Sequence, residues 1–497
     1  MINIENVSFS YPGQASGSLH NLNLSIADGE FVVLCGRSGC GKTTVTRLVN
    51  GLIPYFFAGE LNGCVTVNGM DIAEISMYKI AETVGSVFQN PRTQFFNVDT
   101  DSEIAFGIEN LAVPEGELAY RVSQTAKDLH IENLLERNIF ALSGGEKQKI
   151  AFASVYTMNP DIYLLDEPSS NLDMKSIGEL QEQLALIRDQ GKTVLIAEHR
   201  LYYLMALADR IVYMDQGEIS GIFTPQELAA LPEETRVTMG LRAASLDCVH
   251  PLKIAVPPMA PVLELRDVAL HYQKRTVLEG ISLSASPGEI IGVVGHNGAG
   301  KTTFSRALCG LHKDCSGYFG WHGKAANPKM RQKSAYMVMQ DVNFQMFAES
   351  VQQECVLGIK KPDMELAERT LSELGLAPFM QCHPNTLSGG QKQRVAVAVS
   401  MVCGKELLVF DEPTSGLDYD SMLQMVGLME KLAKLGKVIF IVTHDYEFIC
   451  HSCTRVLHFD EGEMPDDLAM TPENETRLRS LFALNGQTDE LHKEVII

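Results

Sequence analysis

Two glycine-rich segments each follow an apolar run and end in a lysine and two threonines. The first follows residues 31–35, the second follows 290–294, and both fit the pattern GxxxxGK[ST]. Small residues allow successive backbone N–H groups to surround a phosphate, and the helix that follows adds the partial positive charge of its N-terminus. The sequence therefore predicts two phosphate-binding loops. Their candidate binding residues are Gly36, Ser38, Gly39, Cys40, Gly41, Lys42, Thr43 and Thr44, and Gly295, Asn297, Gly298, Ala299, Gly300, Lys301, Thr302 and Thr303.

The lysines and the first threonines have the chemistry to act on a nucleotide. Lys42 and Lys301 are expected to reach the β and γ phosphates, whereas the hydroxyls of Thr43 and Thr302 are expected to hold Mg²⁺. A glycine-rich turn with an incidental lysine is the alternative for one such segment. Two segments in register with the other motifs disfavour that alternative.

Two pairs of adjacent carboxylates follow short apolar runs. Asp166 and Glu167 come after residues 162–165, and Asp411 and Glu412 come after 407–410. Such runs indicate central parallel strands that are buried on both faces. Because successive side chains of a strand point to opposite sides, one carboxylate can assist Mg²⁺ while the other polarises the attacking water. We assign the first role to the aspartates and the second to the glutamates; an acidic loop would be the alternative for a single pair.

The chain is a repeat with a period of about 250 residues, which indicates a duplicated domain rather than a solenoid. From Ser143 to Asp166 is 23 residues, as it is from Ser388 to Asp411. A further 33 residues lead to His199 in the first half and to the matching histidine in the second. Lengths differ in the middle of each half: Lys42 to Gln89 is 47 residues, but the counterpart of this segment is 39.

Composition narrows the class of protein. The chain has 497 residues and a formal net charge of −21, which argues against a surface that collects nucleic-acid phosphates. The odd number of cysteines, 11, suits reduced thiols, and a metal or redox role for Cys450 and Cys453 is disfavoured because no second CxxC occurs. The sequence shows neither an export signal nor an apolar run that could span a membrane.

The segments Leu142-Ser143-Gly144-Gly145-Glu146 and Leu387-Ser388-Gly389-Gly390-Gln391 resemble the signature motif of ATP-binding-cassette ATPases. With the two loops, the resemblance covers both halves. It implies an α/β fold of two P-loop NTPase domains in tandem, each with a RecA-like core, an antiparallel β subdomain and a helical subdomain. The expected domains are 1–225, a linker at 226–260 that contains Pro251, Pro257 and Pro258, a second domain at 261–467, and a tail at 468–497.

The resemblance also assigns roles to individual residues. ATP and Mg²⁺ are the expected cofactors. The catalytic glutamates are joined by the switch histidines His199 and His444, and the D-loop aspartates are Asp173 and Asp418. In addition it implies adenine stacking by Tyr11 and Tyr272, Q-loop glutamines Gln89 and Gln340, signature residues Ser143, Gly145, Ser388 and Gly390, and magnesium ligands Thr43, Gln89, Asp166, Thr302, Gln340 and Asp411.

In this family, two cassettes pair head to tail, so each nucleotide lies between the phosphate loop of one and the signature serine of the other. Ser388 is therefore expected to serve the site of Lys42, and Ser143 the site of Lys301. Neither site lacks an expected group. Asn171 stands where the second half has Gly416, and Glu146 where it has Gln391, so the two sites are expected to be similar but not identical.

The middle of each half indicates a branch of the family. Residues 87–110 carry the pattern FQNPxxQ…EIAFGxEN, which resembles the ATPases of energy-coupling-factor importers, and Gln94 and Gln345 are the extra glutamines of that branch. The resemblance implies a transmembrane coupling protein and a substrate-binding membrane subunit as partners. It places the chain at the cytoplasmic face of the membrane, importing a vitamin or a transition-metal ion. The helical stripes of Leu118, Val122 and Leu129 and of Ala367, Leu371 and Leu374 are expected to be core.

Two other functions remain open. Tandem ATPases of sugar importers are similar in length, but they generally have one degenerate site and lack the FQNPxxQ pattern. Tandem cassettes that act on ribosomes share the duplication, but they usually carry a long charged helical linker. The proline-rich linker and the net charge of −21 disfavour the ribosomal alternative.

Overall fold

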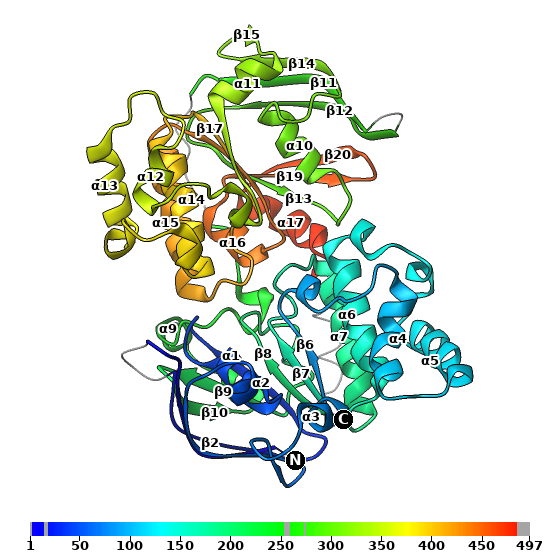
Figure 1. Ribbon diagram of the computed structural model, residues 1–497. Coiled ribbons are helices and arrows are strands. Elements are labelled where there is room, and N and C mark those ends of the chain that lie inside the picture. The colour runs from blue at the N-terminus through cyan, green and yellow to red at the C-terminus, as the bar shows by residue number, and fades with distance from the viewer. Residues whose placement is uncertain (1, 14–17, 253–258, 273–274, 485–497) are drawn as a thin grey trace. The chain divides into compact units, whose positions relative to one another are not determined.

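The computed structural model describes residues 2–13, 18–252, 259–272 and 275–484 (Figure 1). The chain divides into two compact units. The first consists of Met1–Ser245 together with Gly416–Asp420, and the second of Leu246–Ser415 together with Ser421–Ile497.

A six-stranded sheet forms the centre of the first unit, in the order β10-β9-β3-β8-β7-β6. All neighbours run parallel except β10, which is antiparallel to β9. The apolar runs seen in the sequence form the inner strands, because such residues can be buried on both faces. The strands are β3 (Phe31–Gly36), β6 (Val84–Val87), β7 (Ile162–Asp166), β8 (Thr193–Ala197), β9 (Arg210–Asp215) and β10 (Glu218–Phe223).

The two faces of this sheet belong to two different cores. Val32 and Leu34 of β3 pack with the antiparallel sheet, whereas Phe31, Val33 and Cys35 of the same strand pack with helices. The alternation follows from the two-residue period of a strand. The antiparallel sheet, in the order β2-β1-β4-β5, contains β1 (Ile2–Ser10), β2 (Leu19–Ile26), β4 (Glu60–Val67) and β5 (Met70–Asp71).

The helices of the first unit include the elements that flank the candidate site. They are α1 (Lys42–Val49), α2 (Leu52–Tyr55), α3 (Met77–Thr83), α4 (Thr100–Asn110), α5 (Glu115–Asp128), α6 (Gly144–Met158), α7 (Met174–Asp189), α8 (Pro225–Ala229) and α9 (Glu233–Thr238). Among the described residues, no helix is both long and apolar enough to span a membrane.

The second unit repeats the two sheets. Its six-stranded sheet has the order β16-β17-β18-β13-β19-β20, and its antiparallel sheet has the order β12-β11-β14-β15. The strands are β11 (Leu263–Tyr272), β12 (Arg275–Ala285), β13 (Ile290–Val294), β14 (Cys315–Trp321), β15 (Lys324–Ala325), β16 (Ala335–Val338), β17 (Leu407–Asp411), β18 (Val438–Val442), β19 (Arg455–Asp460) and β20 (Glu463–Ala469).

The helices α12, α13 and α14 of the second unit lie together on one side of its central sheet, away from β11, β14 and β15 (Figure 1). The predicted apolar stripe of the second unit is buried, at Ala367, Leu371 and Leu374. In the first unit the predicted stripe is partly buried: Leu129 is buried, and Val122 packs against the core. The helices are α10 (Lys301–Leu308), α11 (Pro328–Ser334), α12 (Val351–Val356), α13 (Met364–Glu373), α14 (Gly389–Val402), α15 (Tyr419–Lys434), α16 (Tyr446–Ser452) and α17 (Glu475–Leu481).

This arrangement confirms the predicted α/β fold, in which each unit joins a mainly parallel sheet, an antiparallel sheet and a helical segment. The division between the units falls after Ser245, inside the stretch 226–260 that we expected to be a linker. That stretch contains α9, and its residues 253–258, with Pro257 and Pro258, lie outside the described part of the chain. Residues 485–497 of the predicted tail also lie outside it, whereas α17 lies within it and buries Leu478.

Candidate nucleotide sites

The first glycine-rich loop connects β3 to α1. Gly36, the last residue of β3, has a φ of 142°, and a Cβ atom added there would lie 2.2 Å from the carbonyl oxygen of Met214. Only glycine fits so close to a neighbouring backbone in this conformation. Gly41 (φ 108°) then precedes the first turn of α1. Local sterics therefore fix a tight turn whose N–H groups lie at the start of a helix, as a phosphate site requires.

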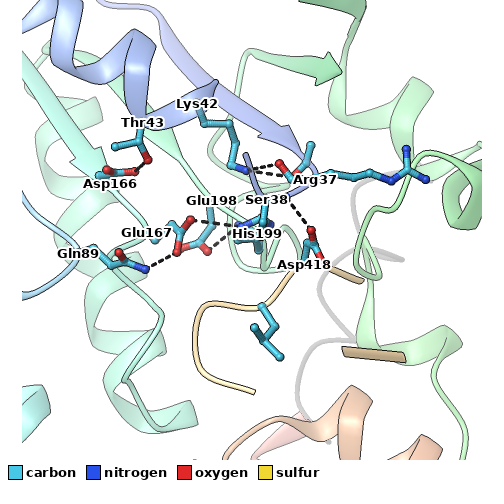
Figure 2. A network of polar contacts seen from close by, with 12 residues as sticks. Arg37, Ser38, Lys42, Thr43, Gln89, Asp166, Glu167, Glu198, His199 and Asp418 are labelled. Atoms are coloured by element: carbon cyan, nitrogen blue, oxygen red, sulfur yellow. Dashed lines mark hydrogen bonds and ion pairs between the residues drawn. The ribbon is translucent and has the colours of Figure 1, made fainter. Parts of the chain in front are cut away.

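Lys42 is buried beneath this loop. Its ammonium group donates hydrogen bonds to the carbonyl oxygens of Gly36 (3.0 Å) and Arg37 (3.2 Å), as Figure 2 shows. A buried ammonium group is stable only when its protons are bonded, and here the loop backbone provides the acceptors. A phosphate that enters the loop would offer charged acceptors in their place.

Asp166 and Thr43 meet at the carboxyl end of β7. The Thr43 hydroxyl donates to the Asp166 carboxylate at 3.2 Å. Burial, and then the neighbouring charge of Glu167, raise the pKa of Asp166 to about 6. A hydroxyl and a carboxylate in contact form a set of hard oxygen donors of the kind that Mg²⁺ prefers, so these residues fit the ion that the sequence predicts.

Glu167 lies between a glutamine and a histidine (Figure 2). The Gln89 amide donates to one carboxylate oxygen at 2.6 Å, and His199 Nε2 lies 3.2 Å from the other. That Nε2 makes no hydrogen bond of normal geometry, so the second contact is a close approach of the imidazole to the carboxylate. Burial acts to raise the pKa of Glu167, but His199 and then Lys42 outweigh it, so the pKa is lowered and the carboxylate stays charged.

The second unit reproduces this arrangement. A Cβ atom at Gly295 would lie 2.1 Å from the carbonyl oxygen of Phe459, and Lys301 donates to the carbonyl oxygens of Gly295 (2.7 Å) and His296 (2.9 Å). Thr302 lies 3.4 Å from Asp411, whose pKa is raised by burial. His444 Nε2 lies 3.4 Å from a carboxylate oxygen of Glu412. The lysine–carbonyl, threonine–aspartate and histidine–glutamate contacts of the first unit therefore recur in the second.

The signature segments begin helices. Ser143 caps α6 and Ser388 caps α14, and each forms a capping box with the residue three positions on, which is Glu146 or Gln391. Gly145 and Gly390 lie in the first turns of these helices. Backbone N–H groups at such a turn are free of intrahelical partners and can donate to an anion. The pairing of each serine with the loop of the other half stays a prediction.

Comparison with known proteins decides the family. A sequence profile of the ABC transporter family matches residues 19–170 and 278–415. The chain belongs to the ABC transporter family. A Treponema denticola protein assigned by name to the ABC transporter ATP-binding proteins is 48% identical over 485 residues, which cover 96% of this chain and 99% of that one. A Methanosarcina mazei protein of the same name is 33% identical over 93% of this chain and 88% of its own.

A solved structure supports the fold of this ABC chain. An archaeal chain described as part of a ribosome-bound complex of Pelota and ABCE1 gives a TM-score of 0.70, with 21% identity, over 96% of this chain and 80% of that one. At that identity the likeness shows the tandem fold alone. The family assignment makes this protein a tandem ABC ATPase, which binds and hydrolyses ATP.

The two cassettes hold their predicted adenine-stacking tyrosines differently. In the first cassette, the Tyr11 hydroxyl accepts a hydrogen bond from Arg47 at 2.9 Å, and the Arg47 guanidinium lies 4.1 Å from the centre of the Phe57 ring. In the second cassette, the Tyr272 side chain is 51% exposed, and its ring lies 5.1 Å from that of His312. The first tyrosine is therefore fixed by neighbours before any ligand arrives, whereas the second is more open.

Each D-loop aspartate accepts a hydrogen bond from a backbone N–H group. Asp173 caps α7 through the Ser176 N–H at 2.8 Å. Within the first unit, Asp418 accepts a hydrogen bond from the Ser38 N–H at 2.6 Å (Figure 2). A charge-assisted bond of this kind fixes the phosphate loop at one of its own candidate binding residues.

Sequence reasoning missed Glu198, a buried carboxylate next to the first switch histidine. It accepts hydrogen bonds from the backbone N–H groups of His199 (2.7 Å) and Arg200 (3.2 Å) and from the Tyr203 hydroxyl (2.9 Å). It therefore orients the turn that carries His199. The second cassette has Thr443 in its place, so the internal repeat gave no signal for it.

Proposed function

We propose that this ABC ATPase is the ATP-hydrolysing subunit of an importer of the energy-coupling-factor type. It uses ATP at two sites to drive uptake of a vitamin, such as a thiamine precursor, or of a transition-metal ion through separate membrane subunits. The observation that carries this proposal is an apolar groove in the first cassette, next to Gln89.

The groove has a volume of about 320 Å³ and lies among β6, α3, α4 and α6. Met77, Tyr78, Phe88, Phe96 and Phe106 give it an apolar lining, and the Phe96 and Phe106 rings stack with their centres 4.9 Å apart. An amphipathic helix that lays its apolar face in a groove is a common mode of recognition, and a cytoplasmic helix of a coupling protein has this form. We therefore infer that such a helix docks here.

Each cassette exposes a phenylalanine at the same place after its Q-loop glutamine. Phe96 is 74% exposed and Phe347, at the matching place in the second cassette, is 75% exposed. Exposed aromatic rings at equivalent positions favour a partner with two similar contact elements. A membrane coupling protein with two cytoplasmic helices meets this requirement.

We infer that a lysine, a glutamate and a histidine carry out hydrolysis in the same way at each site. Lys42 exchanges its bonds with the loop carbonyls for bonds with the phosphates, and Glu167 polarises the attacking water while His199 stays beside it. Lys301, Glu412 and His444 do the same in the second cassette. The oxygen donors Thr43, Gln89 and Asp166, and Thr302, Gln340 and Asp411, would hold Mg²⁺, which supplies charge that stabilises the transferring phosphoryl group.

Fractionation of cells that express the full chain distinguishes the importer proposal from the ribosomal and sugar-importer alternatives. We expect recovery of the chain with membranes, together with a transmembrane protein and a small membrane subunit. Recovery with ribosomes would overturn the importer proposal, and recovery with a sugar permease would support the second alternative. Uptake assays with candidate vitamins and metal ions would then identify the substrate.

The variants Tyr78→Asp and Phe96→Asp test the groove itself. Each places a carboxylate on the apolar surface, so we expect the chain to leave the membrane fraction. Tyr120→Asp is a matched control, because Tyr120 is an exposed aromatic side chain on α5 that does not line the groove. Equal loss of membrane recovery in all three variants would contradict a specific role of the groove.

A further inference from the structure

Two glutamines that hydrolysis does not use close the backbone around the Q-loop. In the first cassette, the Gln94 side-chain oxygen accepts a hydrogen bond from the Phe88 N–H at 3.3 Å, and its amide group donates to the Ala151 carbonyl of α6 at 3.5 Å. In the second cassette, the Gln345 oxygen accepts from the Met339 N–H at 2.8 Å. Each glutamine therefore binds the residue directly before Gln89 or Gln340.

The segment between each pair of glutamines is short and closed on itself. Asn90 accepts from the Arg92 N–H at 3.1 Å, and the Thr93 hydroxyl donates back to the Asn90 carbonyl at 2.8 Å. In the second cassette Asp341 accepts from the Asn343 N–H at 3.0 Å. A loop whose ends are joined by a side chain and whose interior is capped has little freedom to deform, so it should move as one body.

The far end of each loop is held by a buried carboxylate. Glu103 is 2% exposed and accepts from the N–H groups of Phe96 (3.0 Å) and Asn97 (2.8 Å). Glu354 does the same for Phe347 (2.8 Å) and Ala348 (2.7 Å). The exposed phenylalanines therefore stand on backbone that is bonded on both sides, within a few residues of the Q-loop glutamines.

We propose that Gln94 and Gln345 are positioning residues that make each Q-loop segment rigid, so that a displacement of Gln89 or Gln340 on nucleotide binding is carried to Phe96 or Phe347. This inference rests on the proposed roles of Gln89 and of the groove. Without the glutamine side chain, the Q-loop glutamine can still follow the nucleotide, but the phenylalanine no longer follows the glutamine.

A purely structural role makes a different prediction. Loss of an acceptor for a shielded N–H group lowers stability whether or not nucleotide is present. Loss of a rigid connection instead changes what nucleotide does at a distance. The two roles are thus separated by a measurement of the response to ATP at Phe96, made on the full chain without any membrane partner.

Hydrogen–deuterium exchange of the full chain carrying Glu167→Gln and Glu412→Gln, with and without Mg-ATP, is the test. We expect Mg-ATP to slow exchange in peptides that cover both 88–90 and 95–98. Addition of Gln94→Ala should keep the response at 88–90 and abolish it at 95–98, whereas the surface control Gln124→Ala should keep both. A response at 95–98 that survives Gln94→Ala, or that is absent from the parent, would overturn the proposal.

The variant Gln94→Glu keeps the proposal testable if the alanine variant does not fold. Its carboxylate still accepts from the Phe88 N–H but cannot donate to Ala151, so it should retain the response at 95–98. In chains with both catalytic glutamates intact and no membrane partner, Gln94→Ala should leave kcat and KM for ATP within about twofold, because Gln89 still follows the nucleotide. A tenfold fall in kcat would contradict a role confined to the connection between Gln89 and Phe96. None of these outcomes depends on the importer proposal.

Discussion

The two cassettes agree closely around the phosphate loops and differ in the segments that surround them. In both, the lysine bonds to the same two loop carbonyls and the glutamate lies beside the histidine. After the Q-loop, however, the first cassette has α4 with 11 residues and the second has α12 with 6. After α1, the first cassette has α2 and its aromatic neighbours, whereas the second leads into β14 within a few residues.

This difference follows from how tightly the backbone is confined. A Cβ atom at Gly36 or Gly295 would lie within 2.2 Å of a neighbouring carbonyl oxygen, so the turn has no freedom to vary. The segments near α2, α4 and α12 lie at the surface, where length changes cost little. We conclude that the two sites hold the same types of side chain, while the segments around them differ between the cassettes.

Loss of both catalytic glutamates should have the largest effect. Glu167→Gln with Glu412→Gln removes the groups that we propose polarise the attacking water. General-base contributions of about 10²–10⁴-fold are typical, so we expect turnover to fall to background. ATP binding should remain, because the phosphate loops are intact. Steady-state phosphate release and equilibrium ATP binding measure the two properties. Turnover that persists in the double variant would contradict the assignment.

Glycine substitution at the two loops should disturb folding equally. Gly36→Ala and Gly295→Ala each force a Cβ atom against a backbone oxygen at a φ that alanine rarely adopts. We expect each to lower the free energy of unfolding by about 2 kcal/mol or more. Gly39→Ala is the matched control, since a Cβ atom there meets nothing within 4 Å although its φ is also positive. Urea titration of each variant measures the loss in free energy of unfolding. We expect the same loss in both cassettes.

The tyrosines should distinguish the cassettes. Stacking of a base on an aromatic ring contributes about 1–3 kcal/mol, so Tyr11→Ala and Tyr272→Ala should both weaken ATP binding at their own sites. Because Arg47 and Phe57 hold Tyr11 in place, we expect the larger effect in the first cassette. Titration of each variant with ATP gives the two dissociation constants. A larger effect at Tyr272 would reverse this part of the comparison.

Helix caps should give the smallest effects and a difference in pH dependence. Asp99 caps α4 and Ser350 caps α12, each through the N–H group three residues on, so Asp99→Ala and Ser350→Ala should each cost about 1 kcal/mol. Bonds from Ser102 lower the pKa of Asp99 below its ordinary value. Its contribution is therefore present at neutral pH and is lost as the pH falls through the lowered pKa, whereas that of Ser350 does not change. Unfolding curves of the parent and both variants between pH 3 and 7 give the stability difference that each substitution causes. We expect this difference to shrink at low pH for Asp99→Ala and to stay constant for Ser350→Ala.

Much of each site could be predicted because the same chemistry occurs twice at the same spacing. The loops, the Asp-Glu pairs and the histidines lie at strand ends, and strand ends of a parallel sheet converge. Glu198 could not be found in this way, since its counterpart is a threonine and its role depends on backbone N–H groups. The partners of Gln94 and Glu103 were equally hidden, because tertiary folding alone brings a side chain to a particular backbone atom.

The exact point at which the chain divides could not be predicted from local composition. We expected a linker at 226–260, and the chain divides inside that stretch, after Ser245. The residues that follow bond to the second unit: the Arg479 guanidinium donates to the Leu246 carbonyl at 3.1 Å, and the Leu252 N–H to the Cys450 carbonyl at 2.9 Å. Contacts with the distant α16 and α17, rather than local composition, decide to which unit these residues belong.

The claim on which the rest depends is that one chain holds two complete ATP sites. The number of Mg-ATP molecules bound per chain, measured by equilibrium titration of the variant with Glu167→Gln and Glu412→Gln, tests it most directly. We predict two, falling to one when either Lys42→Ala or Lys301→Ala is added. One bound nucleotide in the parent variant would contradict the account. So would two bound nucleotides after addition of either Lys42→Ala or Lys301→Ala.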